Sequence, residues 1–210
     1  MSPTFGTGLH ATVTTTPTND FVSARIAGGL RANAIGERVR YPQIDGAVAN
    51  VELERGTMEF WYRPNYNHND NIKYTIAGTG NWPSPGALHF GKHNNSNQNG
   101  IFLIFYNGNG VRFEHNVAVS AYSWNAGDWL LIRITWDFNV AAGQQNLHLY
   151  LNGTELPLSG QVSRGPQPVP AESPTELIYI GCRDAGSGNG AIIANGVYDE
   201  FRIWNRVIAP

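Results

Sequence analysis

The residues Trp129-Leu-Leu-Ile-Arg-Ile-Thr-Trp-Asp137 are followed by Leu147-His-Leu-Tyr-Leu151 and then by Asn152-Gly153. Along both stretches every second residue is apolar, which places the apolar side chains on one face of a strand. Asn-Gly supplies the positive φ angles that a tight hairpin turn requires. We therefore predict two antiparallel strands, each with one face toward a core and one face away from it.

The same kind of pattern recurs along most of the chain, and no long stretch shows the spacing of an amphipathic helix. Further strands are predicted at 38–41, 57–63, 72–77, 87–91, 101–106, 111–115, 177–182 and 197–204. Many short strands with Gly- and Asn-rich turns between them are typical of an all-β, antiparallel two-sheet β-sandwich. We predict an arm or edge strand within residues 1–20 and a single sandwich domain over 21–210. Residues 159–175 are expected to form a long surface connection.

Composition excludes several classes of partner. The net charge is −2 and the only lysines are Lys73 and Lys92, so no basic run is present to bind nucleic acid. No apolar stretch is long enough to cross a bilayer.

The lone cysteine, Cys182, allows no disulfide within the chain. The residues after Met1 do not resemble a signal peptide, so we expect either a domain of a longer extracellular chain or a virion surface protein made without export.

Four segments together resemble laminin-G-like jelly rolls of the concanavalin A-like lectin and glucanase superfamily. They are Ala27–Pro42, Gly56-Thr-Met-Glu-Phe-Trp-Tyr-Arg-Pro64, Trp129–Gly153, and Ile178–Gly181 with Gly196-Val-Tyr-Asp-Glu-Phe-Arg-Ile-Trp-Asn-Arg206. The resemblance implies a concanavalin A-like jelly roll. It does not imply one function, because this fold hosts lectins, adhesion domains, structural domains and glycanases.

The enzyme hypothesis requires two carboxylates that flank one glycosidic bond. Glu52 and Glu54 have the spacing that places two side chains on one side of a strand. They precede the strongest predicted strand and adjoin Arg55-Gly56, which favours a solvated turn. A lyase-like Gln-Ile-His motif is also missing, since Gln43-Ile44 is followed by Asp45. We therefore predict that the protein is not an enzyme, and a glycanase or polysaccharide lyase is the less favoured hypothesis.

The resemblance also implies a calcium ion at one end of the sandwich, with Asp199 as a ligand. Calcium takes several oxygen ligands, many of them backbone carbonyls, so the other ligands cannot be identified from sequence. The alternative is that Asp199 accepts hydrogen bonds from backbone amides at the start of a strand. Both alternatives stay open at this point.

Strand alternation also predicts a binding surface. In the strand at 57–63, Met58, Phe60 and Tyr62 share the core face, so the residues between them point away. If this strand shares a sheet with the hairpin, one outer face carries Trp61, Arg63, Arg133, Thr135, His148 and Tyr150. Flat rings with interleaved donors suit a sugar ring. The alternative is that a terminal strand, a loop or another subunit covers this face and makes Trp61 part of a second core.

Two loops add candidates for the same function. Trp82 lies on a predicted loop, where an exposed aromatic side chain is difficult to explain by packing. The polar loop 65–70, with Tyr66, is a candidate to join it at one rim, and a plain solvated loop is the alternative. Trp129 and Trp136 are assigned to the core.

The sequence therefore predicts a non-catalytic recognition module that binds carbohydrate or another surface polymer. The alternative is a structural phage virion protein, such as a capsid decoration or tail component, that binds other protein subunits through the same fold.

Overall fold

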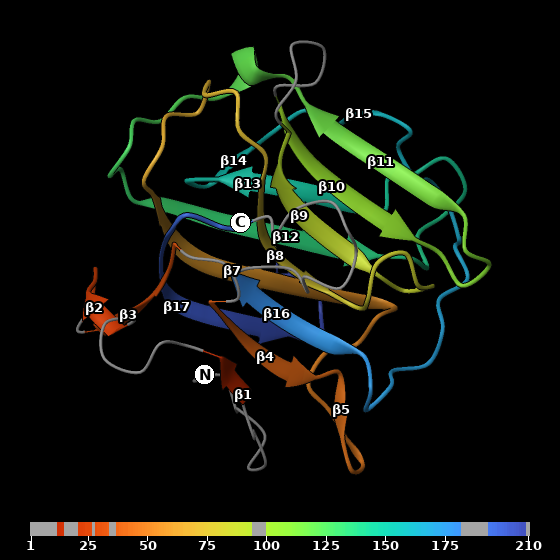
Figure 1. The fold of residues 1–210 in the computed structure, drawn as a ribbon. Coiled ribbons are helices and arrows are strands. Elements are labelled where there is room, and N and C mark those ends of the chain that lie inside the picture. The colour runs from red at the N-terminus through yellow and green to blue at the C-terminus, as the bar shows by residue number, and fades with distance from the viewer. Residues whose placement is uncertain are drawn as a thin grey trace.

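The structure is a computed structural model that describes residues 12–14, 21–26, 28–33, 37–93, 100–181 and 193–208. Two large antiparallel sheets pack face to face (Figure 1), and the one short 3-10 helix among these residues is η1 (Val119–Ala121). The predicted all-β, two-sheet sandwich is confirmed. Within the described residues, no helix has the length and hydropathy to span a membrane.

The eight-stranded sheet is drawn toward the viewer in Figure 1. Its strands run in the order β1 (Thr12–Thr14), β4 (Arg38–Pro42), β16 (Leu177–Gly181), β8 (Tyr74–Thr79), β9 (Leu88–Lys92), β10 (Ile101–Tyr106), β11 (Arg112–Val117) and β15 (Ser159–Gly160). Non-consecutive neighbours such as β4, β16 and β8 show that the chain crosses repeatedly between the two sheets.

The seven-stranded sheet lies behind it. Its strands run in the order β14 (Thr154–Glu155), β13 (Leu147–Leu151), β12 (Leu130–Asp137), β7 (Arg55–Pro64), β17 (Gly196–Trp204), β3 (Gly28–Ala32) and β2 (Phe21–Ser23). A small separate hairpin is formed by β5 (Ile44–Asp45) and β6 (Val48–Ala49).

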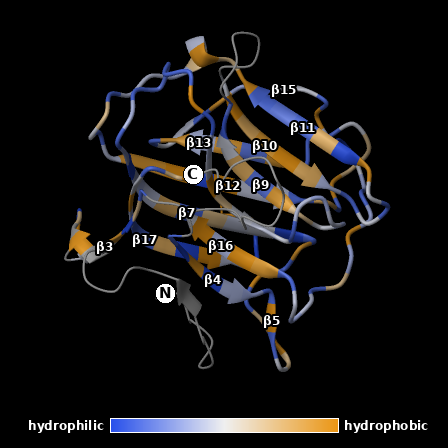
Figure 2. Cartoon of the chain, in the orientation of Figure 1, coloured by the Kyte–Doolittle hydropathy of each residue, from blue (hydrophilic) through white to orange (hydrophobic). Residues whose placement is uncertain are grey.

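The core lies between the sheets and is built by the alternation seen in the sequence. Met58, Phe60 and Tyr62 on β7 are 1%, 0% and 0% exposed. Trp136 on β12 fills the space beside Gly56, where a Cβ would lie 2.3 Å from the indole Cζ2. Figure 2 shows β10 as a largely hydrophobic strand between more hydrophilic segments. Because all of β10 is buried, its continuous apolar run reflects burial on both faces of the sheet.

Several boundaries differ from the predicted ones. The strand predicted at 72–77 begins at Tyr74, because Ile72 lies in the preceding loop with 56% of its surface exposed. The connection 159–175 is less peripheral than expected, since it contributes the edge strand β15 and the buried Ser163. In the predicted arm or edge strand, Thr12–Thr14 pair with β4 at the sheet edge. Cys182 lies outside the described residues.

Candidate functional site

The residues predicted to bind a ligand lie mainly on the outer face of the seven-stranded sheet. The strand register places Arg133 between Glu59 and Tyr150, and Leu131 opposite Trp61. Strands β7, β12 and β13 thus bring together Trp61, Arg63, Arg133, Thr135, His148 and Tyr150. All of these side chains except Thr135 are half-buried, so their outer parts reach solvent.

The guanidinium group of Arg25 lies over the indole ring of Trp61. The Cζ atom of Arg25 lies 3.6 Å from the indole centroid, a close cation–π contact. Asp199 lies directly opposite Trp61 on β17, and its Oδ2 accepts a hydrogen bond from the Ile26 amide at 2.7 Å. This bond fixes the segment that holds Arg25 over Trp61.

A second arginine and tryptophan pair lies beside the first. The Cζ atom of Arg63 lies 5.1 Å from the Trp129 ring centroid. Leu130 pairs with Tyr62, so the preceding Trp129 is level with Arg63 on the outer face. The core assignment of Trp129 was wrong, because it is half-buried on the outer face. We call Arg25, Trp61, Arg63 and Trp129 the Arg–Trp corner.

Farther along the same face the charged groups are paired within the chain. Arg133 binds Glu59 through Nε at 2.7 Å and Nη2 at 2.6 Å. Arg202 lies 3.9 Å from the same carboxylate and 2.7 Å from Glu200. His148 contacts Glu155 at 2.6 Å. Glu59 and Glu155 therefore orient Arg133 and His148, the two donors that lie beside Tyr150.

Thr135 does not belong to the accessible surface. It is 2% exposed and pairs in register with Thr57. The Thr57 hydroxyl donates to the Arg206 carbonyl and accepts from the Ile208 amide, both at 2.9 Å. The C-terminal segment thus covers this end of the sheet, as the alternative hypothesis predicted for the whole face, and leaves Trp61 and Tyr150 partly exposed.

Trp82 lies apart from this group, on the outer side of the other sheet. Its ring centroid is 5.2 Å from that of His89 and 5.0 Å from that of Tyr106, both in edge-to-face geometry. The Cζ atom of Arg112 lies 5.8 Å from the indole centroid. Trp82 is half-buried rather than freely exposed, because these contacts pack it onto the sheet.

The rings beneath Trp82 are buried. Those on the outer face of the eight-stranded sheet are His89 (1% exposed), Phe102 (3%), Tyr106 (7%) and Tyr179 (5%). Phe102 packs directly onto Gly91, where a Cβ would lie 2.5 Å from the ring Cζ. Among the described residues the two outer faces therefore differ, since Trp82 is the one partly exposed ring over the eight-stranded sheet, whereas the outer face of the seven-stranded sheet presents several.

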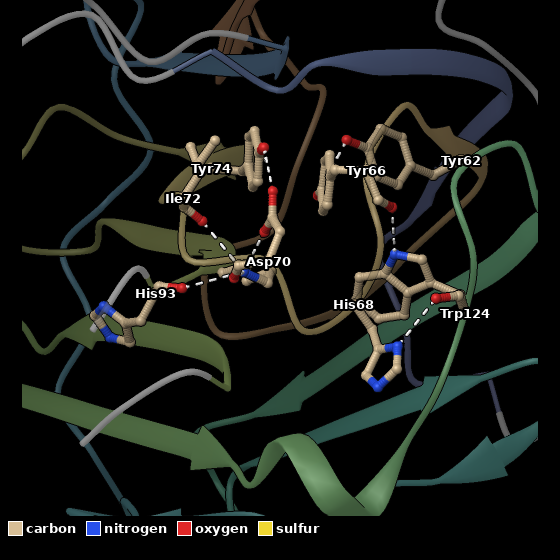
Figure 3. A network of polar contacts seen from close by, with 9 residues as sticks. Tyr62, Tyr66, His68, Asp70, Ile72, Tyr74, His93 and Trp124 are labelled. Atoms are coloured by element: carbon tan, nitrogen blue, oxygen red, sulfur yellow. Dashed lines mark hydrogen bonds and ion pairs between the residues drawn. The ribbon is translucent and has the colours of Figure 1, made fainter. Parts of the chain in front are cut away.

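A buried polar network closes one end of the sandwich, and sequence reasoning did not identify it. Lys92 is 0% exposed, and its Nζ donates to Asp70 Oδ1 at 2.7 Å, to the Ile72 carbonyl at 3.2 Å and to the His93 carbonyl at 3.3 Å. The Asp70 carbonyl is a fourth acceptor. Tyr74 donates to the other Asp70 oxygen at 2.6 Å, as Figure 3 shows. The ammonium group is thus surrounded by oxygens of the chain itself.

The loop at 65–70 is anchored by the same network. The Tyr66 ring stacks on Tyr74 with centroids 3.7 Å apart, and the Trp124 indole donates to the Tyr66 carbonyl at 3.1 Å (Figure 3). Burial raises the pKa of the Tyr66 hydroxyl well above its usual value. Tyr66 is therefore part of the core, so the aromatic ring of this loop does not form a ligand platform.

His115 forms a second buried polar contact. Its Nδ1 donates to the Leu103 carbonyl at 3.2 Å, and its Nε2 accepts from the Ser163 amide at 2.9 Å. Burial lowers the pKa of His115 to about 4, so the imidazole is neutral at pH 7. Both His115 and Ser163 are 0% exposed, so a buried hydrogen bond joins β11 to the long connection 159–175.

Asp199 has the geometry of a hydrogen-bond acceptor. In addition to Ile26, the Glu200 amide donates to Asp199 Oδ1 at 2.8 Å, so both carboxylate oxygens accept from backbone amides. The residues that the structure describes contain no cluster of three or more His, Cys, Asp or Glu suited to a metal ion. The described side chains thus fit the hydrogen-bonding role, and calcium at Asp199 stays a prediction.

Replacing Asp199 with Ala separates the two roles. We expect a loss of about 1–3 kcal/mol in the free energy of unfolding, because two partly buried amides lose a charged acceptor. The loss should be the same in millimolar calcium and in excess chelator. A melting temperature that chelator lowers in the wild type, but not in Asp199→Ala, would instead show that Asp199 binds calcium.

Glu52 and Glu54 lie just before β7, outside the strand. Asn139 Nδ2 donates to Glu54 Oε1, and Glu52 Oε2 lies 3.9 Å from Arg55 Nε. Both carboxylates therefore have polar partners just before β7 begins, at the other end of that strand from Trp61 and Arg63.

Comparison with solved structures shows the same fold in larger chains. The binding domain of botulinum neurotoxin serotype D/C matches with a TM-score of 0.61 and 17% identity, over 95% of this chain and 44% of that one. The botulinum neurotoxin serotype G binding domain matches with a TM-score of 0.57 and 17% identity, over 98% of this chain and 45% of that one. Trypanosoma rangeli sialidase matches with a TM-score of 0.56 and 16% identity, over 95% of this chain and 28% of that one. The chain thus spans less than half the length of each.

No curated protein matches the sequence. A family model described as the concanavalin A-like lectin/glucanases superfamily matches residues 37–210, which include most of both sheets. The chain therefore belongs to the concanavalin A-like lectin/glucanases superfamily.

Proposed function

We propose that the protein is a non-catalytic recognition module that binds carbohydrate or another surface polymer through the outer face of the seven-stranded sheet. The observation that carries this proposal is the partial exposure of Trp61, Trp129 and Tyr150 on that face. Among the described residues on the outer face of the other sheet, Trp82 is half-buried and the rings of His89, Phe102, Tyr106 and Tyr179 are buried. Partly exposed aromatic residues on one flat face are typical of a contact surface.

The chemistry of this face suits a sugar ring. An indole or phenol ring offers a flat apolar surface to the C–H face of a pyranose, and neighbouring donors bind the equatorial hydroxyls. Arg25 covers one face of the Trp61 indole, so a sugar would contact the rest of that ring and the Tyr150 phenol. Arg133 and His148 lie beside Tyr150 and are oriented by Glu59 and Glu155. Such preorganised donors reduce the entropy that binding costs.

The fold by itself does not choose between binding and catalysis. It occurs in botulinum neurotoxin chains, including type C, whose cell entry is described as dependent upon interaction with two ganglioside molecules, and also in a sialidase chain. The non-catalytic proposal rests on Glu52 and Glu54, which contact Arg55 and Asn139 just before the start of the central strand β7. We expect no release of reducing ends from polysaccharides incubated with the protein.

The decisive variants are Trp61→Ala and Tyr150→Ala, each tested separately on a glycan array and by affinity electrophoresis in polysaccharide gels. Each should weaken binding about tenfold or more, because a central aromatic contact is typically worth about 2 kcal/mol. Trp82→Ala is the matched control, since it removes a half-buried indole from the opposite sheet.

Thermal melts establish that each variant is folded before binding is compared. Equal binding by wild type, Trp61→Ala and Tyr150→Ala would refute the proposed face. Loss of binding in Trp82→Ala alone would move the site to the eight-stranded sheet. No glycan binding, together with self-association that Trp61→Ala abolishes, would favour the virion-subunit alternative.

A further inference from the structure

The Arg–Trp corner holds two arginines without a carboxylate partner. In the described part of the chain, neither Arg25 nor Arg63 forms an ion pair, and each guanidinium instead lies over an indole ring. Arg25 is exposed and Arg63 is half-buried. A protonated guanidinium on an aromatic ring keeps its N–H groups free for an acceptor from outside the molecule.

In the described part of the chain, the carboxylates on the neighbouring strands and beside Trp129 have other partners. Glu59 binds Arg133 and approaches Arg202. Asp199 uses both oxygens on the amides of Ile26 and Glu200 and is only 8% exposed. Asp128, next to Trp129 in the chain, is exposed, and its Oδ2 accepts a hydrogen bond from the Asn125 amide at 2.8 Å. These carboxylates therefore have other partners within the chain, while the guanidinium groups of the corner lie over indole rings.

The stacked arrangement also orients the two guanidinium groups. Trp61 and Arg63 alternate on β7, and Trp129 is level with Arg63 on the next strand, so both pairs lie at one end of the same face. A planar guanidinium fixed by a ring presents a fork of donors that matches a carboxylate or a sulfate. Lysine lacks this geometry, and neither lysine of the chain lies on this sheet.

We propose that the Arg–Trp corner binds an anionic group of the polymer, so that the ligand class is an acidic polysaccharide bearing carboxylate or sulfate groups. This inference rests on the proposed function and adds the charge of the ligand to it. A net charge of −2 gives the whole protein no general attraction for polyanions, so the selectivity comes from the local pair of arginines.

Binding of the full chain to polygalacturonate and heparin, compared with neutral dextran and β-glucan, tests the inference by titration calorimetry. The acidic polymers should bind more tightly, and their affinity should fall as salt is raised. Arg25→Gln and Arg63→Gln should each weaken acidic binding about tenfold, and by a larger factor than they weaken binding to neutral polymers. Arg63→Lys keeps the positive charge but lacks the planar guanidinium. Its affinity for acidic polymers should lie between those of the wild type and Arg63→Gln.

Arg55→Gln is the matched control, because it removes the same charge at the other end of β7, where the side chain is 60% exposed and lies 3.9 Å from Glu52. It should bind like the wild type. Neutral polymers bound as tightly as acidic ones would overturn this inference and leave the proposed function standing. Absence of binding to every polysaccharide would overturn both. Binding to anionic phospholipid vesicles alone would overturn the polysaccharide assignment.

Discussion

Replacing Lys92 with Met is expected to lower the free energy of unfolding by about 3–5 kcal/mol, the usual cost of removing one partner from a buried ion pair. The ammonium group satisfies Asp70 and the carbonyls of Ile72 and His93, and it is 0% exposed. Met fills much of the same volume but donates no hydrogen bond. The carboxylate and the carbonyls would then remain partly buried without their donor. Urea denaturation followed by tryptophan fluorescence measures the loss.

Lys73→Met is the matched control, because it removes the other lysine, which is half-buried and lies over the Phe102 ring. Its effect should stay within about 1 kcal/mol. The double variant Lys92→Met, Asp70→Asn should be more stable than Lys92→Met alone, since it also removes the unpaired charge. A Lys92→Met protein as stable as Lys73→Met would show that the network contributes no net stability.

Lowering the pH from 7.5 to 5 is expected to destabilise the protein through His115. Burial lowers the pKa of the folded imidazole to about 4, whereas the unfolded side chain has the ordinary value of 6.5. Between these values the unfolded chain binds the proton more readily, so stability is complete above about pH 6.5 and is lost as the pH falls toward 4. At about 1.4 kcal/mol per pKa unit, the full loss is about 3 kcal/mol, with ~2 kcal/mol of it by pH 5.

The pH series should be repeated with His115→Gln, which removes the titrating group and keeps a side chain able to donate and accept. This variant should be less stable at pH 7.5 but should lose less between pH 7.5 and 5. Burial also lowers the pKa of His93, so the free energy of unfolding of His115→Gln should still fall with pH, but less steeply than that of the wild type. His148→Gln controls for an accessible histidine. An unchanged slope in His115→Gln would rule out His115 as the source of the acid sensitivity.

The strand pattern predicted most of the fold because period-two alternation is a local property. Met58, Phe60 and Tyr62 point inward because any register that buries one of them buries all three. The end of the loop before β8 was not predictable in this way. Ile72 is apolar and continues the pattern, but its carbonyl is held by Lys92 from a strand twenty residues farther along the chain.

The candidate site was predictable in part. Alternation placed Trp61, Arg133 and Tyr150 on the outer faces of their strands. Predicting that they share one face required only that these three strands be neighbours in one sheet. Arg25 could not be found from the sequence, because its position over Trp61 depends on a hydrogen bond between Ile26 and Asp199, 173 residues apart. A signal for Trp129 did exist: counting back one residue from Leu130, which faces the core, places Trp129 outward.

The burial of Lys92 has a practical consequence for binding measurements. Because that ammonium group is enclosed, Lys73 is the lysine that an amine-reactive surface or dye can reach. Lys73 immediately precedes β8 in the eight-stranded sheet and lies over Phe102 of the same sheet. Immobilisation through this side chain would anchor the protein by the sheet opposite Trp61 and Tyr150, with the proposed recognition face directed away from the support.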